Sequence, residues 1–248
     1  MPISNYPGGF SSGVTIKGLP ILNSYSGNVY WVDSNSSGSA GTFATPDQTL
    51  SAATNRTTAN NGDIVMVKPG HAETVSSAGA LDAFDVAGVT YIGLGAGTAQ
   101  PTITLDTATT ADIDIDAANV TIDNFHVVAN FADIAVVFDV NATDFTLRNS
   151  RFTQSGDNLN AKVCVQDAAA AASDRITVEN CNAVMYDAAN THFINFAGTG
   201  TGHKIVGNVL HGDWGTMCIG GAGVITFCEI MGNSIGNLAT TSDGCISL

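Results

Sequence analysis

Residues 113–124, IDIDAANVTIDN, contain the unit that decides the fold of this 248-residue chain. An apolar–polar–apolar triplet, Ile113-Asp114-Ile115, leads through a short turn into a second short run, Val120–Asn124. Strict alternation places the two apolar side chains on one face of a strand and the polar side chain on the other. The unit therefore predicts two short strands joined by a turn, each with one buried face.

The same unit recurs about every 23 to 31 residues. Its triplets are Phe84-Asp85-Val86, Ile113-Asp114-Ile115, Phe138-Asp139-Val140, Val163-Cys164-Val165, Ile194-Asn195-Phe196, Met217-Cys218-Ile219 and the half-copy Gly244-Cys245-Ile246. Its second runs are VTYIG, VTIDN, FTLRN, ITVEN, KIVGN and VITFCE. Repetition at this period is typical of solenoids, in which each repeat packs on its neighbours. With three faces per coil, we predict an all-β fold, a right-handed parallel β-helix of about seven coils over residues 62–248.

The repeat also predicts two columns of polar residues along the solenoid. The middle residues of the triplets should point outward, in a column of Asp85, Asp114, Asp139, Cys164, Asn195, Cys218 and Cys245. Asparagines that follow the second strands should stack at a turn, where Asn tolerates the left-handed conformation: Asn124, Asn149, Asn180 and Asn208. We expect the five cysteines to be reduced packing residues, with a Cys218–Cys245 disulfide as the alternative.

Residues 1–32 lack the repeat and contain three prolines. We interpret them as an extended arm that anchors the protein to a partner through its aromatic residues, Tyr6, Phe10, Tyr30 and Trp31. Residues 33–61 are expected to form a flexible polar linker and a short helix, Pro46–Asn60, with Thr45 as N-cap. The helix would cover the open edge of the first coil, whose backbone groups would otherwise be unpaired.

Two stretches near the start of the repeats resemble a known superfamily. GTFATPDQTLSAATNRTTANNGDIVMVKPGHAETV (residues 41–75) and VTYIGLGAGTAQPTITL (residues 89–105) are similar to the opening of pectin-lyase-like β-helix proteins. MPISNYPGGFSSGVTIKGLPIL (residues 1–22) resembles the start of β-helix proteins encoded among tailed-bacteriophage structural genes. Together with the repeats, these resemblances cover nearly the whole chain.

The phage resemblance implies a virion protein without enzymatic activity, most simply an auxiliary or decoration protein of the capsid. Its expected partner is the major capsid protein or another virion protein. The repeat register runs to the last residues, so Ile246 and Leu248 are expected to contact a partner. We also expect a homo-oligomer, with a trimer as one candidate symmetry.

The net charge of −14 disfavours nucleic-acid binding, which needs Lys and Arg to neutralise phosphates. We expect no membrane segment, because no run of about 18 apolar residues occurs. The residues Met1-Pro2-Ile3-Ser4 show no basic start or apolar region of a secretory signal. The expected location is the virion, after synthesis in the host cytoplasm.

Because the pectin-lyase-like superfamily includes polysaccharide lyases and hydrolases, a polysaccharide-degrading or glycan-binding protein is the alternative. Carboxylates are available, since Asp112, Asp114 and Asp116 alternate and should share one outer face. Basic residues are scattered, and none recurs along the Asp column: Lys68, Arg148, Arg151 and Lys204. We therefore expect no catalytic residues and no cofactor. The row Asp112, Asp114 and Asp116 would hold Ca²⁺ if it binds a cation, and a solvated outer face is the simpler interpretation.

Overall fold

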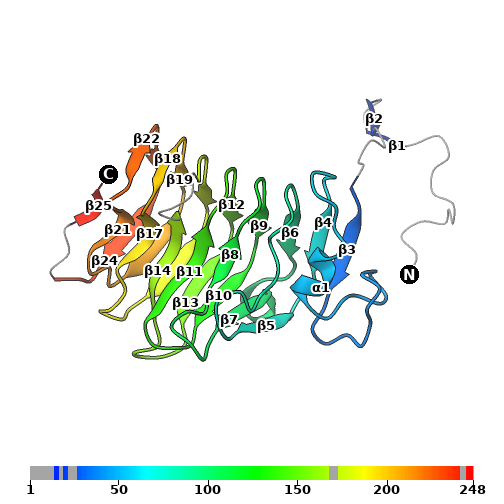
Figure 1. The fold of residues 1–248 in the computed structure, drawn as a ribbon, viewed down its shortest axis with the longest axis horizontal. Coiled ribbons are helices and arrows are strands. Elements are labelled where there is room, and N and C mark those ends of the chain that lie inside the picture. Colours follow the sequence, from blue (N-terminus) through cyan, green and yellow to red (C-terminus); the bar gives the residue numbers. More distant parts are fainter. Residues whose placement is uncertain (1–13, 17–18, 22–26, 168–172, 241–243, 248) are drawn as a thin grey trace.

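The computed structural model describes residues 14–16, 19–21, 27–167, 173–240 and 244–247. Parallel strands stack into a β-solenoid of about seven turns, which confirms the predicted parallel β-helix (Figure 1). Successive strands of a coil lie in three different sheets, so strands from consecutive coils lie side by side in each sheet. In the described residues, no helix is long and apolar enough to span a membrane.

Three parallel sheets form the faces of the solenoid. The eight-stranded sheet contains β3 (Val29–Val32), β4 (Ile64–Val67), β6 (Thr90–Gly93), β9 (Thr121–Asp123), β12 (Thr146–Arg148), β15 (Thr177–Glu179), β19 (Lys204–Val206) and β23 (Glu229–Met231). The seven-stranded sheet contains β5 (Ala72–Val75), β7 (Thr102–Leu105), β10 (His126–Ala129), β13 (Arg151–Gln154), β16 (Asn182–Met185), β20 (Val209–Gly212) and β24 (Ser234–Asn237). The six-stranded sheet contains β8 (Ile113–Ile115), β11 (Ile134–Val140), β14 (Ala161–Asp167), β17 (His192–Phe196), β21 (Met217–Gly220) and β25 (Gly244–Ser247).

The remaining elements are short. β1 (Val14–Ile16) pairs with β2 (Leu19–Ile21) in an antiparallel ladder. β18 (Thr199–Thr201) pairs with β22 (Val224–Thr226) in a parallel one. The helices are α1 (Leu50–Thr54) and the 3₁₀ turn η1 (Gly97–Ala99).

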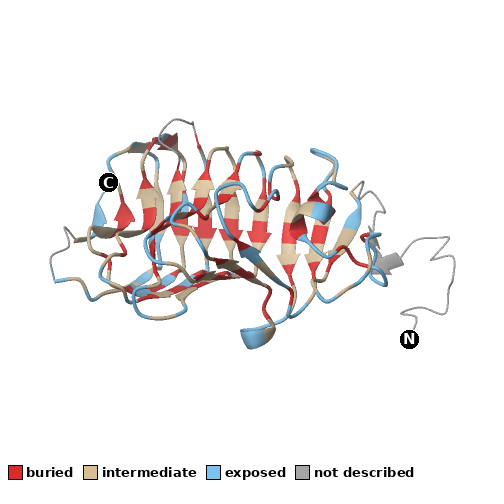
Figure 2. Cartoon of the chain, turned by 60° about the horizontal axis from the view of Figure 1, so that its bottom comes forward, coloured by how far each residue is buried: buried red, intermediate tan, exposed pale blue. Residues whose placement is uncertain are grey.

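Alternating side chains fill the interior of the solenoid, and buried residues appear as stripes across the strands (Figure 2). Aromatic rings stack from coil to coil on the inside. The ring of Phe152 lies 6.0 Å from that of Phe138 and 5.3 Å from that of Phe193. Trp214 continues the row 6.2 Å beyond Phe193. Edge-to-face contacts of this kind stabilise more than the burial of area alone.

The outward column of the triplets matches the prediction at Asp114 and Asp139 and then departs from it. Asp114 is opposite Asp139, but Asp139 is opposite Gln166 rather than Cys164. The column continues through Asn195, Gly220 and Ser247. The predicted positions of Cys164, Cys218 and Cys245 are therefore wrong by two residues. The reason is that β14 buries Val163, Cys164 and Val165 in succession, which breaks the simple alternation.

The asparagine column is correct for three members and wrong for the fourth. Asn124, Asn149 and Asn180 are in equivalent positions after β9, β12 and β15, and all three have a positive φ. The next position is Gly207, with φ 69°, and not Asn208. Glycine and asparagine both tolerate this conformation, so either satisfies the turn. Asn208 is instead buried, and its amide oxygen accepts a hydrogen bond from the Cys181 N–H at 2.8 Å.

The first triplet, Phe84-Asp85-Val86, is not a strand. Phe84 is buried with φ 66°, and Val86 is half-buried. The six-stranded sheet therefore begins at β8, one coil later than predicted. Phe84 still fills the core, because its ring packs against Tyr91 with 4.6 Å between centroids.

The N-terminal part of the solenoid corrects three expectations. Tyr30 and Trp31, which were expected in the arm, lie in β3, the first strand of the eight-stranded sheet. The predicted helix is shorter, because Asp47 pairs with Val32 in an extended bridge and so cannot be helical. The helix starts after Thr49, whose hydroxyl accepts the Ala52 N–H. The segment expected to be a flexible linker is a loop held by backbone hydrogen bonds, such as Trp31 N–H to Gly41 O.

Candidate functional site

The acidic face of the solenoid lies on the six-stranded sheet. Ala111, Ile113 and Ile115 are buried, while the alternate residues of the run point outward as predicted: Asp112, Asp114 and Asp116. Asp139 is opposite Asp114 on the next strand. No lysine or arginine in the described part of the chain forms an ion pair with Asp112, Asp114 or Asp139.

Crowding and burial keep these carboxyls protonated to a higher pH than usual. Burial raises the pKa of Asp112 to about 6, and the negative charge of Asp114 adds to the effect. The pKa of Asp114 is raised by burial and then by the charges of Asp116 and Asp139. Burial also raises the pKa of Asp139, although a hydrogen bond from Gln166 opposes this. A protonated carboxyl beside ionised ones is the arrangement that general acid–base chemistry uses.

The row of Asp112, Asp114 and Asp116 on this face was the expected position of a Ca²⁺ ion. Among the described residues, no group of three or more His, Cys, Asp or Glu side chains is arranged to hold a metal ion. Asp116 is hydrogen-bonded to the amide of Asn141 at 3.0 Å, so one of the three expected Ca²⁺ ligands is already engaged. The geometry therefore adds no support to the calcium expectation.

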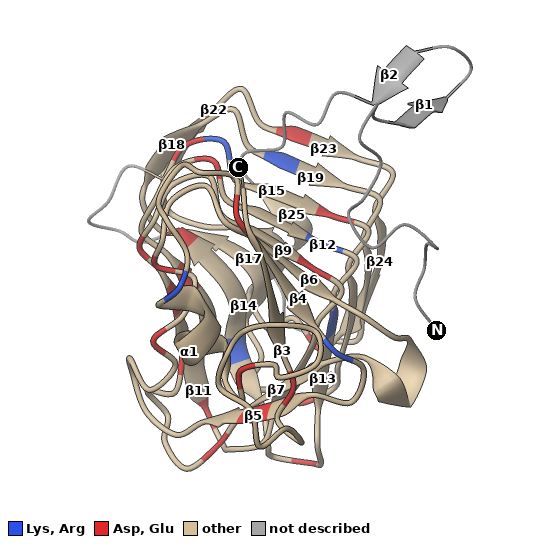
Figure 3. Ribbon diagram, turned by 90° about the vertical axis from the view of Figure 1, so that its right-hand side faces the viewer, with Lys and Arg blue, Asp and Glu red and all other residues tan. Residues whose placement is uncertain are grey.

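The eight-stranded sheet carries charges of both signs on its outer face. Acidic and basic residues alternate from strand to strand (Figure 3). Arg148 bonds Asp123 at 3.0 Å and lies next to Glu179, and Lys204 is opposite Glu229. With three acidic and two basic residues, this ladder is close to neutral.

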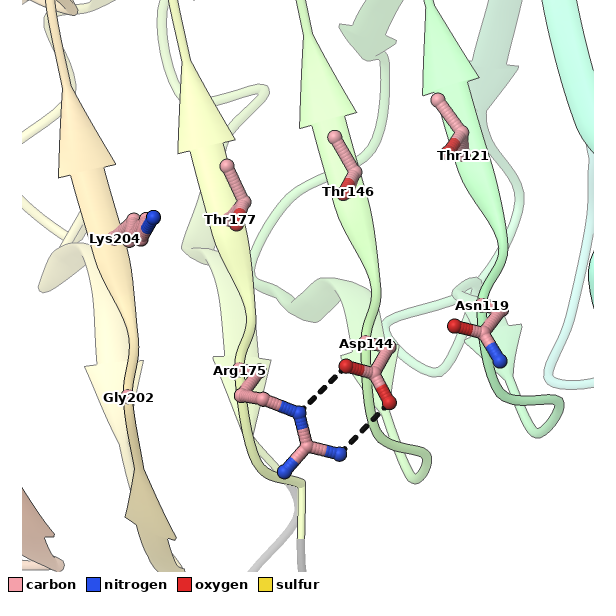
Figure 4. Close-up of a pocket in the computed structure, with 8 residues that line it drawn as sticks. All are labelled: Asn119, Thr121, Asp144, Thr146, Arg175, Thr177, Gly202 and Lys204. Carbon is pink, nitrogen blue, oxygen red and sulfur yellow. Dashed lines mark hydrogen bonds and ion pairs between the residues drawn. The ribbon is translucent and has the colours of Figure 1, made fainter.

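A shallow hollow of about 510 Å³ lies on the same sheet (Figure 4). Its floor is a row of three threonines in register, Thr121, Thr146 and Thr177. Its rim is a column of turn residues with positive φ. In this column the Arg175 guanidinium donates two hydrogen bonds to the Asp144 carboxylate, at 2.6 and 2.8 Å. The sequence analysis missed this column, although its residues stand regularly two positions before the outward residue of each second strand: Asn119, Asp144, Arg175 and Gly202.

The seven-stranded sheet presents a different surface. Each of its strands has two outward positions, and in this sheet none is Asp or Glu. The positions are Ala72, Thr74, Thr102, Thr104, His126, Val128, Arg151, Thr153, Asn182, Val184, Val209, His211, Ser234 and Gly236. We call this surface the acid-free face.

Arg151 and His126 are neighbours on the acid-free face. The Arg151 guanidinium donates to Nδ1 of His126 at 2.9 Å, so the other ring nitrogen carries the proton and donates to the Thr153 hydroxyl at 2.8 Å. Burial, together with the charge of Arg151, lowers the pKa of His126 to about 4. The imidazole is therefore neutral at physiological pH and cannot share the positive charge.

Two histidines, His71 and His203, are buried in the core. His71 is buried, where its Nδ1 accepts the Ser34 N–H and its Nε2 bonds Glu73. His203 replaces an aliphatic residue of the core and accepts the Ile176 N–H at 3.2 Å. Both act in packing.

All five cysteines are free thiols.

The last coil exposes large apolar side chains. Five of them lie on or beside β22, β23, β24 and β25: Val224, Phe227, Met231, Leu238 and Ile246. Phe227 is 88% exposed and has φ 53°, in the position that Gly202 occupies one coil earlier. A phenylalanine where the repeat elsewhere has Asn, Asp, Arg or Gly is the signal in the sequence that marks this surface.

The residues expected to bind a partner are not gathered in one place. Trp31 packs on Phe43 with 4.9 Å between ring centroids, at the β3 end of the solenoid. Ile246, which is 47% exposed, lies in β25 at the opposite end (Figure 1). Tyr6, Phe10 and Leu248 lie outside the described residues.

Comparison of the chain with protein-family models, with curated proteins and with solved structures finds no match.

Proposed function

We propose that this protein is a non-enzymatic structural component of a tailed-phage virion, most simply an auxiliary protein of the capsid. The setting comes from the resemblance of residues 1–22 to β-helix proteins of phage structural genes. The solenoid is a rigid spacer whose last coil carries the binding surface for the virion partner, and that partner is the major capsid protein or another virion protein.

The observation that carries this proposal is the apolar surface of the last coil. Soluble proteins rarely expose contiguous apolar patches unless a partner covers them. Phe227 follows β22, Met231 ends β23 and Ile246 lies in β25, and β23 and β25 are the last strands of two sheets, so a partner that covers this end of the solenoid could contact all three. Aromatic residues and methionine are also enriched in protein–protein contacts.

Quantitative mass spectrometry of purified virions tests the proposal. A capsid auxiliary protein is expected in many copies per particle, while a tail or fibre protein would be present in few. Absence of the chain from purified virions would overturn the virion assignment.

The carboxyls of the six-stranded sheet favour a second candidate, a protein that cleaves polysaccharides. Asp112 has a raised pKa and lies two residues, about 7 Å, from Asp114 on the same run, while Asp139 faces Asp114 on the next strand, and strands in register are about 4.8 Å apart. The two carboxyl groups of an inverting glycosidase are about 6.5–9.5 Å apart, and those of a retaining one about 5–5.5 Å. Release of reducing or unsaturated ends from bacterial polysaccharides, abolished by Asp112→Asn, would replace the structural proposal with this one.

A further inference from the structure

The arginine that has no carboxylate partner among the described residues lies on the acid-free face. Of the four arginines, three form ion pairs with aspartates: Arg56 with Asp47, Arg148 with Asp123, and Arg175 with Asp144. Arg151 has no carboxylate partner among the described residues, and its buried Nε has no hydrogen-bond acceptor. A half-buried guanidinium gains from a carboxylate, which can accept two parallel hydrogen bonds from it.

The six-stranded sheet has the opposite deficiency. Asp114 and Asp139 are in register on adjacent strands, and no described cation pairs with either. Burial removes part of the solvation of each carboxylate, and the two negative charges repel each other. One face of the chain therefore lacks a cation and another lacks an anion.

The two faces complement each other coil by coil. Asp114 and His126 belong to one coil, Asp139 and Arg151 to the next, and Gln166 and Asn182 to the one after. Two copies placed side by side with parallel axes would thus set the Arg151 cation against Asp139, the neutral ring of His126 against Asp114, and the Asn182 amide against the Gln166 amide. No shift along the axis is needed. A rotation without translation is the operation that generates closed rings.

Electrostatics also favours this face for self-association. The chain has a net charge of −14, so two copies repel each other over most of their surface. An approach through the acid-free face encounters the least repulsion and sets complementary charges together, which selects one orientation.

We propose that copies of this chain assemble side by side into a closed ring, in which the acid-free face of each copy packs on the six-stranded sheet of the next and Arg151 pairs with Asp139 of that neighbour. The ring goes beyond the proposed virion role, because the contact depends only on this chain.

Light scattering after size-exclusion chromatography of the purified full chain tests the ring. We expect an oligomer, with a mass that is a whole multiple, greater than one, of the monomer mass. Arg151→Glu and Asp139→Arg are each expected to give monomers, and the double variant is expected to regain the wild-type mass because the pair is restored with its charges exchanged. Thermal unfolding of each variant shows whether it is folded.

A matched control comes from the same coil. Arg148→Ala and Arg151→Ala each remove one arginine, but Arg148 lies on the eight-stranded sheet and is paired with Asp123. Only Arg151→Ala should dissociate the ring. A monomeric wild type, a ring that survives Arg151→Glu, or a folded double variant that stays monomeric would overturn the inference. A ring-forming chain that is absent from virions would instead overturn the proposed function alone.

Discussion

The rings of Phe152 and Phe193 meet edge to face on consecutive coils, with 5.3 Å between centroids and an interplanar angle of 89°. Phe193 also contacts Trp214 on the next coil, so it joins three coils. Phe193→Ala should lower the free energy of unfolding by about 3–5 kcal/mol, because it removes a fully buried ring and leaves a cavity. Denaturant unfolding followed by circular dichroism measures the change. Phe193→Leu fills most of the space and should cost clearly less; equal losses for both variants would contradict this account.

Gly207 is expected to be intolerant of a side chain. It has φ 69°, and a Cβ there would lie 2.7 Å from Oδ1 of Asn180. Gly207→Ala should therefore destabilise the protein by about 1–2 kcal/mol or more. Asn180→Gly removes the contacting side chain and keeps a residue suited to the left-handed turn. In a double-mutant cycle, Gly207→Ala should cost less in the Asn180→Gly background, and strict additivity would show that the contact does not matter.

Stability should depend on pH through Asp112. Its folded-state pKa, about 6, is above the unfolded value, so the folded state binds the proton more tightly. Stability from this group is complete below about pH 4 and is lost as pH rises through about 6. Asp112→Asn should therefore raise the stability at pH 7–8 by about 1 kcal/mol, after allowance for solvent screening.

Asp144 provides a control of opposite sign for that measurement. Its hydrogen bond with Arg175 lowers its pKa, so its contribution is present at neutral pH and is lost as pH falls. Asp144→Asn should lower the melting temperature at pH 7 and have little effect in acid. Parallel pH profiles for the two variants would refute the assignment of signs.

The cysteines should differ in reactivity along the chain. Cys245 is exposed and Cys228 is half-buried, whereas Cys164, Cys181 and Cys218 are buried. Burial raises the pKa of Cys181 to about 12 and also raises the pKa of Cys164 and Cys218, which suppresses the reactive thiolate. Alkylation of the native protein at neutral pH, read by peptide mass spectrometry, should modify Cys245 first and the three buried thiols only after unfolding. Early labelling of Cys164 would contradict the register of β14.

Substitution of Phe227 should affect partner binding with little effect on stability. It is 88% exposed and has a left-handed backbone, so Phe227→Gly should leave the free energy of unfolding unchanged or raise it by at most about 1 kcal/mol. The same change removes the most exposed apolar side chain of the last coil and should reduce incorporation into virions. Normal incorporation of this variant would place the docking surface elsewhere.

The sequence was sufficient to predict the solenoid because alternation and repetition act on every coil. Ile113-Asp114-Ile115 and Phe138-Asp139-Val140 alternate strictly, and both were placed correctly in register. The register predicted for Val163–Val165 was wrong because three consecutive residues are buried there. The repeat alone does not reveal where a strand bends. The position predicted for Asn208 was wrong because Gly207 meets the same backbone requirement and occupies the turn in place of an asparagine.

The candidate site was less predictable for a physical reason. The Asp112–Asp116 row is contiguous in sequence, and its outward placement followed from alternation. The isolation of Arg151 depends on residues from the seven strands of the acid-free face, which are spread over more than 150 residues of the chain. Such a property becomes visible only when the coils are stacked.

The stacking of coils also determines how the protein bears mechanical load. Every parallel ladder joins one coil to the next, and each coil contacts only its neighbours. Tension on the chain at β25 would therefore peel the solenoid one coil at a time. Each step would release about 27 residues, which extend to roughly 90 Å at about 3.3–3.6 Å per residue. The folded chain is thus a series of similar units that unfold one after another under tension, while the coils that have not yet unfolded remain intact.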